Sequence, residues 1–86
     1  MKYIIAVFNN RTQTMIFYNK LKAKRVACSI INNPRATNLT CGICVKFYVQ
    51  NLSVARAVLS NLNGFIGFYN YYQIGSGIPT VSPLSR

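Results

Sequence analysis

The sequence predicts an α+β fold, and three patterns along the chain indicate it. Residues 3–8 form an apolar run, residues 11–24 show helical spacing, and residues 43–49 alternate between apolar and other side chains. A second helix and a last strand follow, which gives the order β-α-β-β-α-β. That order is typical of a ferredoxin-like α/β sandwich, in which one four-stranded antiparallel sheet carries two helices on one face.

The first two elements are a buried strand and a capped helix. Residues 3–8 are rich in Ile, Val and aromatic side chains, as in a central strand. Asn10 and Gln13 form a variant of the capping box, in which Asn10 caps the helix and Gln13 reaches back to it. A helix over residues 11–24 should therefore follow. Its expected inward side chains are Thr14, Phe17, Tyr18 and Leu21.

The second and third strands are predicted on either side of a proline-containing loop. Residues 26–31 form a short strand that ends at Asn33-Pro34, because proline disfavours helical geometry before it. Residues 43–49 alternate strictly, so their side chains should occupy two faces. One face carries Ile43, Val45, Phe47 and Val49, and the other carries Cys44, Lys46 and Tyr48.

The remaining elements are a second helix, a last strand and a tail. Ser53 is a suitable N-cap, and Asn63-Gly64 supplies a stop after apolar residues at helical spacing, namely Val54, Ala55, Val58, Leu59 and Leu62. A fourth strand should lie within residues 65–74. Residues 75–86 lack periodicity and contain two of the three prolines. We therefore expect one domain over residues 1–74 and a flexible C-terminal tail over residues 75–86.

The charge balance limits the chemistry of this 86-residue chain. It contains ten Lys and Arg and no Asp, Glu or His, for a net charge of +10. Without carboxylates or imidazole, the chain lacks the usual general bases, catalytic triads and oxygen-ligand metal sites. We expect no enzyme activity of its own, no metal site and no cofactor. A polyanion is the favoured kind of partner.

The number of cysteines and the hydropathy of the chain indicate the cellular compartment. Three cysteines cannot form a closed disulfide framework, which favours a reducing compartment. No apolar run approaches the roughly 18 residues of a membrane-spanning helix. We therefore expect a cytoplasmic protein without a transmembrane segment.

The segment from Asn33 to Cys44 holds the most plausible chemistry. Pro34 fixes a turn, Arg35 adds a guanidinium, and Gly42 frees the backbone before the next strand. Cys41 and Cys44 add thiols at a spacing of three. Loops held by rigid elements often carry binding or reactive groups.

The residues around this segment resemble a known family. They are Ile30-Ile31-Asn32-Asn33-Pro34-Arg35, then Ala36 to Thr40, then Cys41-Gly42-Ile43-Cys44-Val45-Lys46-Phe47, with Leu21 and Tyr3-Ile4-Ile5 also fitting. In this pattern the chain resembles the small bacterial domains of the selenium/sulfur carrier-like family, over roughly residues 2–70. Such domains normally carry acidic residues in the first helix and the loop, which this chain lacks.

The resemblance implies a role for one thiol. It makes Cys41 the candidate carrier thiol of a persulfide-type sulfur or selenium carrier, with Pro34, Arg35 and Gly42 shaping its loop. Sulfur or selenium donor and acceptor proteins would then be its partners. A carrier needs an exposed thiolate of lowered pKa, and Arg35 and the positive field favour the thiolate of Cys41.

The other two thiols have simpler interpretations. Cys44 has the spacing of a redox partner for Cys41, but strand geometry points residues three apart to opposite faces, so incidental placement is favoured. Cys28 is expected to pack in the core as a small hydrophobe.

Two alternatives to a carrier remain open. One is a basic RNA-binding module, with Lys20, Lys22, Lys24 and Arg25 as a cationic cluster, Lys46 and Tyr48 on a strand, and further aromatic side chains at Phe68, Tyr69, Tyr71 and Tyr72. The other is a structural or assembly subunit that forms a homo-oligomer or binds an acidic partner.

Overall fold

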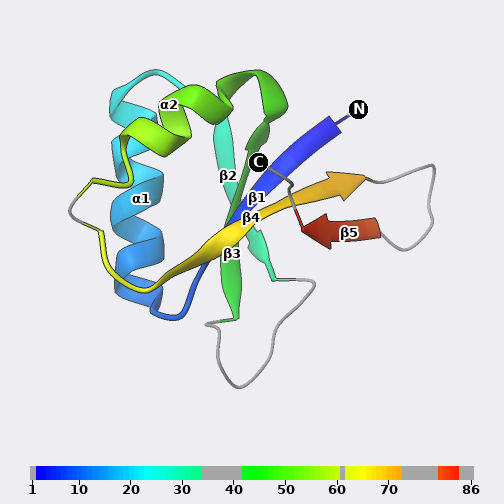
Figure 1. Ribbon diagram of the computed structural model, residues 1–86. Coiled ribbons are helices and arrows are strands. Elements are labelled where there is room, and N and C mark those ends of the chain that lie inside the picture. The colour runs from blue at the N-terminus through cyan, green and yellow to red at the C-terminus, as the bar shows by residue number, and fades with distance from the viewer. Residues whose placement is uncertain (1, 34–41, 61, 73–79, 84–86) are drawn as a thin grey trace.

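The computed structural model describes residues 2–33, 42–60, 62–72 and 80–83, and it shows an α+β fold with a five-stranded antiparallel sheet (Figure 1). The strands are β1 (Lys2–Phe8), β2 (Cys28–Asn32), β3 (Ile43–Tyr48), β4 (Phe65–Tyr72) and β5 (Thr80–Pro83). The helices are α1 (Arg11–Ala23), the 3₁₀ turn η1 (Val49–Asn51) and α2 (Leu52–Ala57). The strand order is β2-β3-β1-β4-β5. β1 is therefore the central strand, as its apolar sequence predicted.

The sheet has one strand more than the sequence analysis predicted. β5 pairs antiparallel with β4, from Tyr72↔Thr80 to Tyr69↔Pro83. The prediction of a four-stranded sheet is therefore wrong, because Thr80–Pro83 lies in a stretch where Gly and Pro hide any alternation. The division of the chain into a domain over residues 1–74 and a tail over residues 75–86 stays a prediction.

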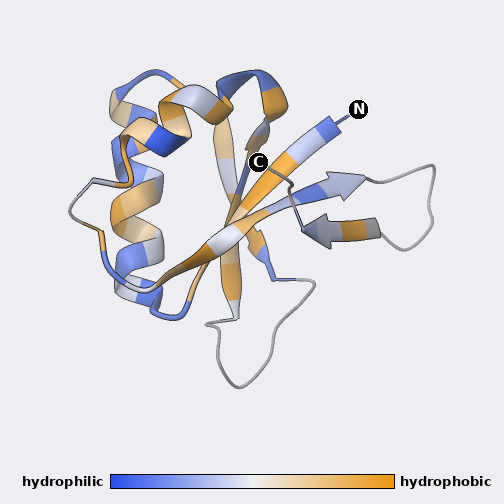
Figure 2. Ribbon diagram, in the orientation of Figure 1, coloured by the Kyte–Doolittle hydropathy of each residue, from blue (hydrophilic) through white to orange (hydrophobic). Residues whose placement is uncertain are grey.

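Both helices pack on the same face of the sheet, over the larger of two apolar clusters. This helix-side core combines strand residues with Phe17 and Leu21 of α1 and with Ala55 of α2. Figure 2 shows that β1 and β3 carry hydrophobic residues over most of their length. The cluster consists of Ile4, Ala6, Phe8, Phe17, Leu21, Val26, Val45, Phe47, Ala55 and Val58.

A smaller cluster lies on the opposite face of the sheet, called the second face below. Its buried members are Ile5, Val7, Cys44 and Tyr71, and every described residue that packs with them comes from a strand. The register explains this division, since alternate side chains of each strand point to opposite faces. The alternation predicted for β3 is confirmed for Val45 and Phe47, which face the helices, and for Cys44, which faces away.

The start of α1 matches the expected cap only in part. The Asn10 side-chain oxygen accepts a hydrogen bond from the Gln13 amide at 3.1 Å, as a capping residue should. The Gln13 side chain does not reach back to Asn10. Its Oε1 instead accepts a hydrogen bond from the Asn63 amide at 3.1 Å, which joins α1 to the chain before β4.

The second helix begins earlier and ends sooner than predicted. Ser53 is not its N-cap, because η1 turns the chain at Val49–Asn51 and α2 starts at Leu52. Val49 is consequently exposed in η1 and does not continue the inward face of β3. Val58 nevertheless stays buried against the helix-side core after α2 ends at Ala57.

Candidate functional site

The segment that carries the candidate thiol connects β2 to β3. Pro34, Arg35 and Cys41 lie outside the described residues, so their roles stay predictions. The two residues that flank the segment are adjacent, because the Asn33 amide donates a 3.0 Å hydrogen bond to the Gly42 carbonyl oxygen. The last strand pair before them is Asn32↔Ile43.

Gly42 is exposed at the start of β3, and its surroundings are open. A Cβ atom placed on Gly42 would meet no atom within 4 Å, and its φ is not in the left-handed region. The backbone at this position can therefore be adopted by other residue types. The supporting role of Gly42 in the loop stays a prediction.

Cys44 is completely buried on the second face of the sheet. Its relative exposure is 0%, and it packs with Ile5, Val7 and Tyr71. A thiol in this position behaves as a small hydrophobic side chain and is inaccessible to a second protein. A pairing between Cys44 and Cys41 stays a prediction, because Cys41 lies outside the described residues.

Cys28 lies at the start of β2 on the helix side of the sheet. It pairs with Phe47 and packs, half-buried, against the helix-side core, in keeping with the expected packing role. Burial raises the pKa of the Cys28 thiol, and the nearby Lys22 ammonium opposes this by lowering it. The thiolate of Cys28 is therefore disfavoured.

The cationic cluster of the sequence analysis lies at the C-terminal end of α1. Lys20, Lys22, Lys24 and Arg25 are all exposed. The Lys22 ammonium lies 5.5 Å from the centroid of the Tyr18 ring. Lys20 and Lys24 line a hollow of about 270 Å³ beside Val58. This cluster therefore belongs to the helix side of the molecule.

Lys46 and Tyr48, which the sequence analysis grouped with this cluster, lie on the second face. The Lys46 ammonium is 4.5 Å from the centroid of the Tyr3 ring and 5.6 Å from that of Tyr71. The Tyr3 and Tyr48 rings lie beside each other, with centroids 5.1 Å apart. The structure thus divides the predicted RNA-binding residues between two sides of the protein.

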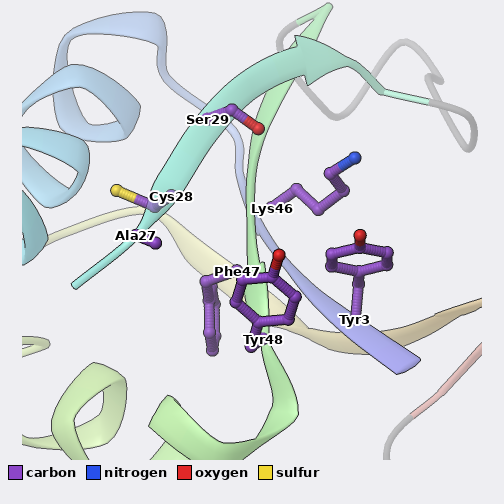
Figure 3. A pocket seen from close by; sticks show the side chains of 7 residues that line it. All are labelled: Tyr3, Ala27, Cys28, Ser29, Lys46, Phe47 and Tyr48. Carbon is purple, nitrogen blue, oxygen red and sulfur yellow. The ribbon is translucent and has the colours of Figure 1, made fainter. Parts of the chain in front are cut away.

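A hollow of about 250 Å³ opens beside these tyrosines (Figure 3). It extends from Tyr3, Lys46 and Tyr48 to the edge strand β2. Figure 3 shows the Cys28 sulfur directed away from the Lys46 ammonium and the tyrosine hydroxyls. The residues that line the hollow are Tyr3, Ala27, Cys28, Ser29, Lys46, Phe47 and Tyr48.

The aromatic residues named in the sequence analysis are also divided. Tyr69 and Tyr71 pack with the cluster of the second face, whereas Phe68 packs against the helix-side core. The register places Tyr72 on the helix side as well, opposite Lys2. Tyr3 was missed, because β1 is apolar on both faces and its sequence alone does not assign a face.

Comparison with known proteins identifies the family but no individual relative. Within the described ranges, no helix is long and apolar enough to span a membrane. No curated protein and no solved structure matches the chain. The sequence model of the family described as "Putative Se/S carrier protein-like" matches residues 2–68, which includes every element from β1 to the middle of β4. The chain therefore belongs to this selenium/sulfur carrier-like family.

Proposed function

We propose that the protein is a persulfide-type carrier of sulfur or selenium, with Cys41 as the carrier thiol. Membership of the selenium/sulfur carrier-like family supports a role in carrying these elements. The observation that carries the assignment to Cys41 is that neither of the two described thiols suits the task. Cys44 is fully buried, and the pKa of Cys28 is raised by burial.

The position of Cys41 in the chain fits a carrier. It lies one residue before Gly42, which is exposed and hydrogen-bonded through its carbonyl oxygen to Asn33. A short segment whose ends are held by a strand pair can present a thiol to two partners in turn. Donor and acceptor proteins would each dock against this end of the β2–β3 pair.

The transfer itself requires no acid or base from the protein. The Cys41 thiolate attacks the terminal sulfur of a donor persulfide, so that a bond forms between that sulfur and Cys41 Sγ. The sulfur–sulfur bond of the donor breaks at the same time, and the donor cysteine leaves as a thiolate. The same exchange onto an acceptor thiol restores the Cys41 thiolate. The terminal sulfur keeps its oxidation state throughout, which suits a chain without Asp, Glu or His.

Positive charge favours the reactive form of the thiol in this proposal. Arg35 lies six residues before Cys41 in the sequence, and the whole chain carries a net charge of +10. Nearby cations lower the pKa of a thiol because they stabilise the thiolate. Cys41 would then be a thiolate at a pH where Cys28 is still protonated.

Mass spectrometry of the intact protein tests the proposal. After incubation with a cysteine desulfurase and cysteine, the protein should gain the mass of one sulfur atom, and a thiol reductant should remove it. Cys41→Ser should show no gain, whereas the matched control Cys28→Ser should load normally. An adduct that persists in Cys41→Ser would overturn the assignment. So would the absence of any adduct while the desulfurase itself carries a persulfide.

A further inference from the structure

Four residues on the second face of the sheet form a compact aromatic and cationic surface, called the tyrosine–lysine face below. They are Tyr3 of β1, Lys46 and Tyr48 of β3, and Tyr71 of β4. The register brings them together, because Tyr3 is paired with Tyr48 on one side and with Tyr71 on the other. The Tyr3 ring meets the Tyr71 ring edge-on at 6.4 Å between centroids. Three rings and one ammonium group thus lie together on this face of the sheet, where the Tyr71 ring itself is buried.

Two hollows flank this surface, and Tyr48 borders both of them. The hollow of about 250 Å³ contains Lys46, Tyr3 and Ser29. The other, of about 340 Å³, is lined by Lys2, Tyr48, Val49 and Gln50. Each hollow is therefore lined by Tyr48 together with a lysine.

Flat rings beside a lysine fit a chain of unpaired nucleotides. Bases of single strands stack on aromatic side chains, whereas bases in a duplex are already stacked on each other. The Lys46 ammonium beside the rings is suited to contact a phosphate. The hydroxyl groups of Ser29, Tyr3 and Tyr48 border the same hollow and offer partners to a ribose 2′-hydroxyl.

The charge of the chain favours this occupant over a second copy of the protein. Two copies that met through this face would each bring a net charge of +10 and no acidic side chain. They would repel each other, whereas a polyanion would be attracted over the whole approach.

We propose that the tyrosine–lysine face binds single-stranded RNA, with a base stacked on Tyr48 and a neighbouring phosphate at Lys46. This binding goes beyond sulfur or selenium transfer and uses neither Cys41 nor its loop. Cys41→Ser should therefore bind RNA with the affinity of the unchanged protein. A failure of either proposal leaves the other in place.

Fluorescence anisotropy with a short labelled oligouridine tests the face directly. Tyr48→Leu should weaken binding by about tenfold or more, because one stacked base is lost. Tyr48→Phe keeps the ring and should retain most of the affinity. Lys46→Gln should make the slope of log affinity against log salt shallower by about 0.7, the amount expected for one phosphate contact on a single strand. Circular dichroism checks that each variant is folded.

A matched control separates this face from the general charge of the protein. Lys24→Gln makes the same charge change on the helix side and should leave the salt slope unchanged. A deoxyribose version of the same oligomer should bind more weakly, because it lacks the 2′-hydroxyls.

Five results would each overturn the proposal. They are no binding at low salt, full affinity in Tyr48→Leu, an equal effect of Lys24→Gln and Lys46→Gln, equal affinity for the deoxyribose oligomer, or a homodimer in light scattering that Tyr48→Leu dissociates.

Discussion

The amide of Asn33 donates a 3.0 Å hydrogen bond to the carbonyl oxygen of Gly42, so the two residues that flank the Cys41 segment are joined through their backbones. This bond uses only main-chain atoms. Gly42 contributes its carbonyl oxygen, which every residue type possesses, and has free space where a side chain would be. The anchoring of the segment therefore does not depend on glycine at this position.

Gly42→Ala should accordingly be tolerated. We expect the free energy of unfolding to change by no more than about 0.5 kcal/mol, as at an ordinary surface position. Sulfur loading of Cys41 should proceed at the rate of the unchanged protein. Urea unfolding and intact-mass kinetics measure the two quantities. A large loss of stability would show that the Asn33 hydrogen bond depends on glycine after all.

Gly64→Ala should be much more damaging. Gly64 has a φ of +76° and accepts a 2.8 Å hydrogen bond from the Asn9 amide through its carbonyl oxygen. A Cβ atom on Gly64 would collide with the Asn9 side-chain oxygen. The left-handed backbone alone should lower the free energy of unfolding by about 1–2 kcal/mol.

The Gly64 prediction has a matched control within β4. Gly67 has no left-handed φ, and a Cβ there would lie 3.7 Å from the Tyr69 ring, an ordinary contact. Gly67→Ala should therefore change the thermal midpoint little, whereas Gly64→Ala should lower it by several degrees. The added substitution Asn9→Gly should recover part of the loss. Equal effects at the two glycines would contradict this account.

Arg25→Gly should stabilise the protein. Arg25 has a φ of 62° just after α1, where the Val26 amide bonds to the Leu21 carbonyl oxygen and the Arg25 amide to that of Lys22. This is the Schellman arrangement, in which glycine is the preferred residue. The gain in the free energy of unfolding should be about 0.5–1 kcal/mol, measured by urea denaturation. Lys24→Gly, at a φ of −87°, should give no gain.

The rate at which Cys28 is alkylated should increase with pH, with a midpoint above that of an ordinary cysteine. Burial raises the pKa of Cys28 above its ordinary value of 9.0, so the rate of its reaction with iodoacetamide should increase with pH and reach its half-maximal value above pH 9.0. In Cys41→Ser the measured alkylation is that of Cys28, because Cys41 is removed and Cys44 is buried. Lys22→Gln should move the midpoint higher by removing the opposing ammonium, and Lys24→Gln should not.

The raised pKa of Cys28 also determines how the free energy of unfolding changes with pH. The raised pKa means that the unfolded chain releases the Cys28 proton before the native protein does. The contribution of Cys28 to stability is therefore complete below its ordinary pKa and is lost as the pH rises through the native value. A midpoint below 9.0 would contradict both statements.

The fold could be predicted wherever apolar residues recurred along the chain with one regular spacing. Helical spacing identified Thr14, Phe17 and Leu21 as buried, and alternation identified the two faces of β3. Prediction failed where a turn set a helix boundary: η1 precedes α2, which starts at Leu52 and not after Ser53, the N-cap that the sequence predicted.

The sites were predictable to different degrees. The half-buried environment of Cys28 against the helix-side core agrees with the packing expected of it, whereas the full burial of Cys44 was not predicted. The tyrosine–lysine face could not be assembled from spacing, because Tyr3 and Tyr48 are far apart in the sequence. Only the register of β1 against β3 places their rings together.

The Asn10 cap of α1 has a consequence for acid conditions. Its side chain is a carboxamide, so the hydrogen bond to Gln13 does not depend on a titrating group. No Asp, Glu or His occurs anywhere in the sequence, so no carboxylate or imidazole side chain gains a proton as the pH falls from about 7 to about 2. The repulsion among its cations is therefore already close to its full strength at neutral pH. Acid unfolds many proteins by protonating their carboxylates. This protein should stay folded in acid, because it has none in its side chains.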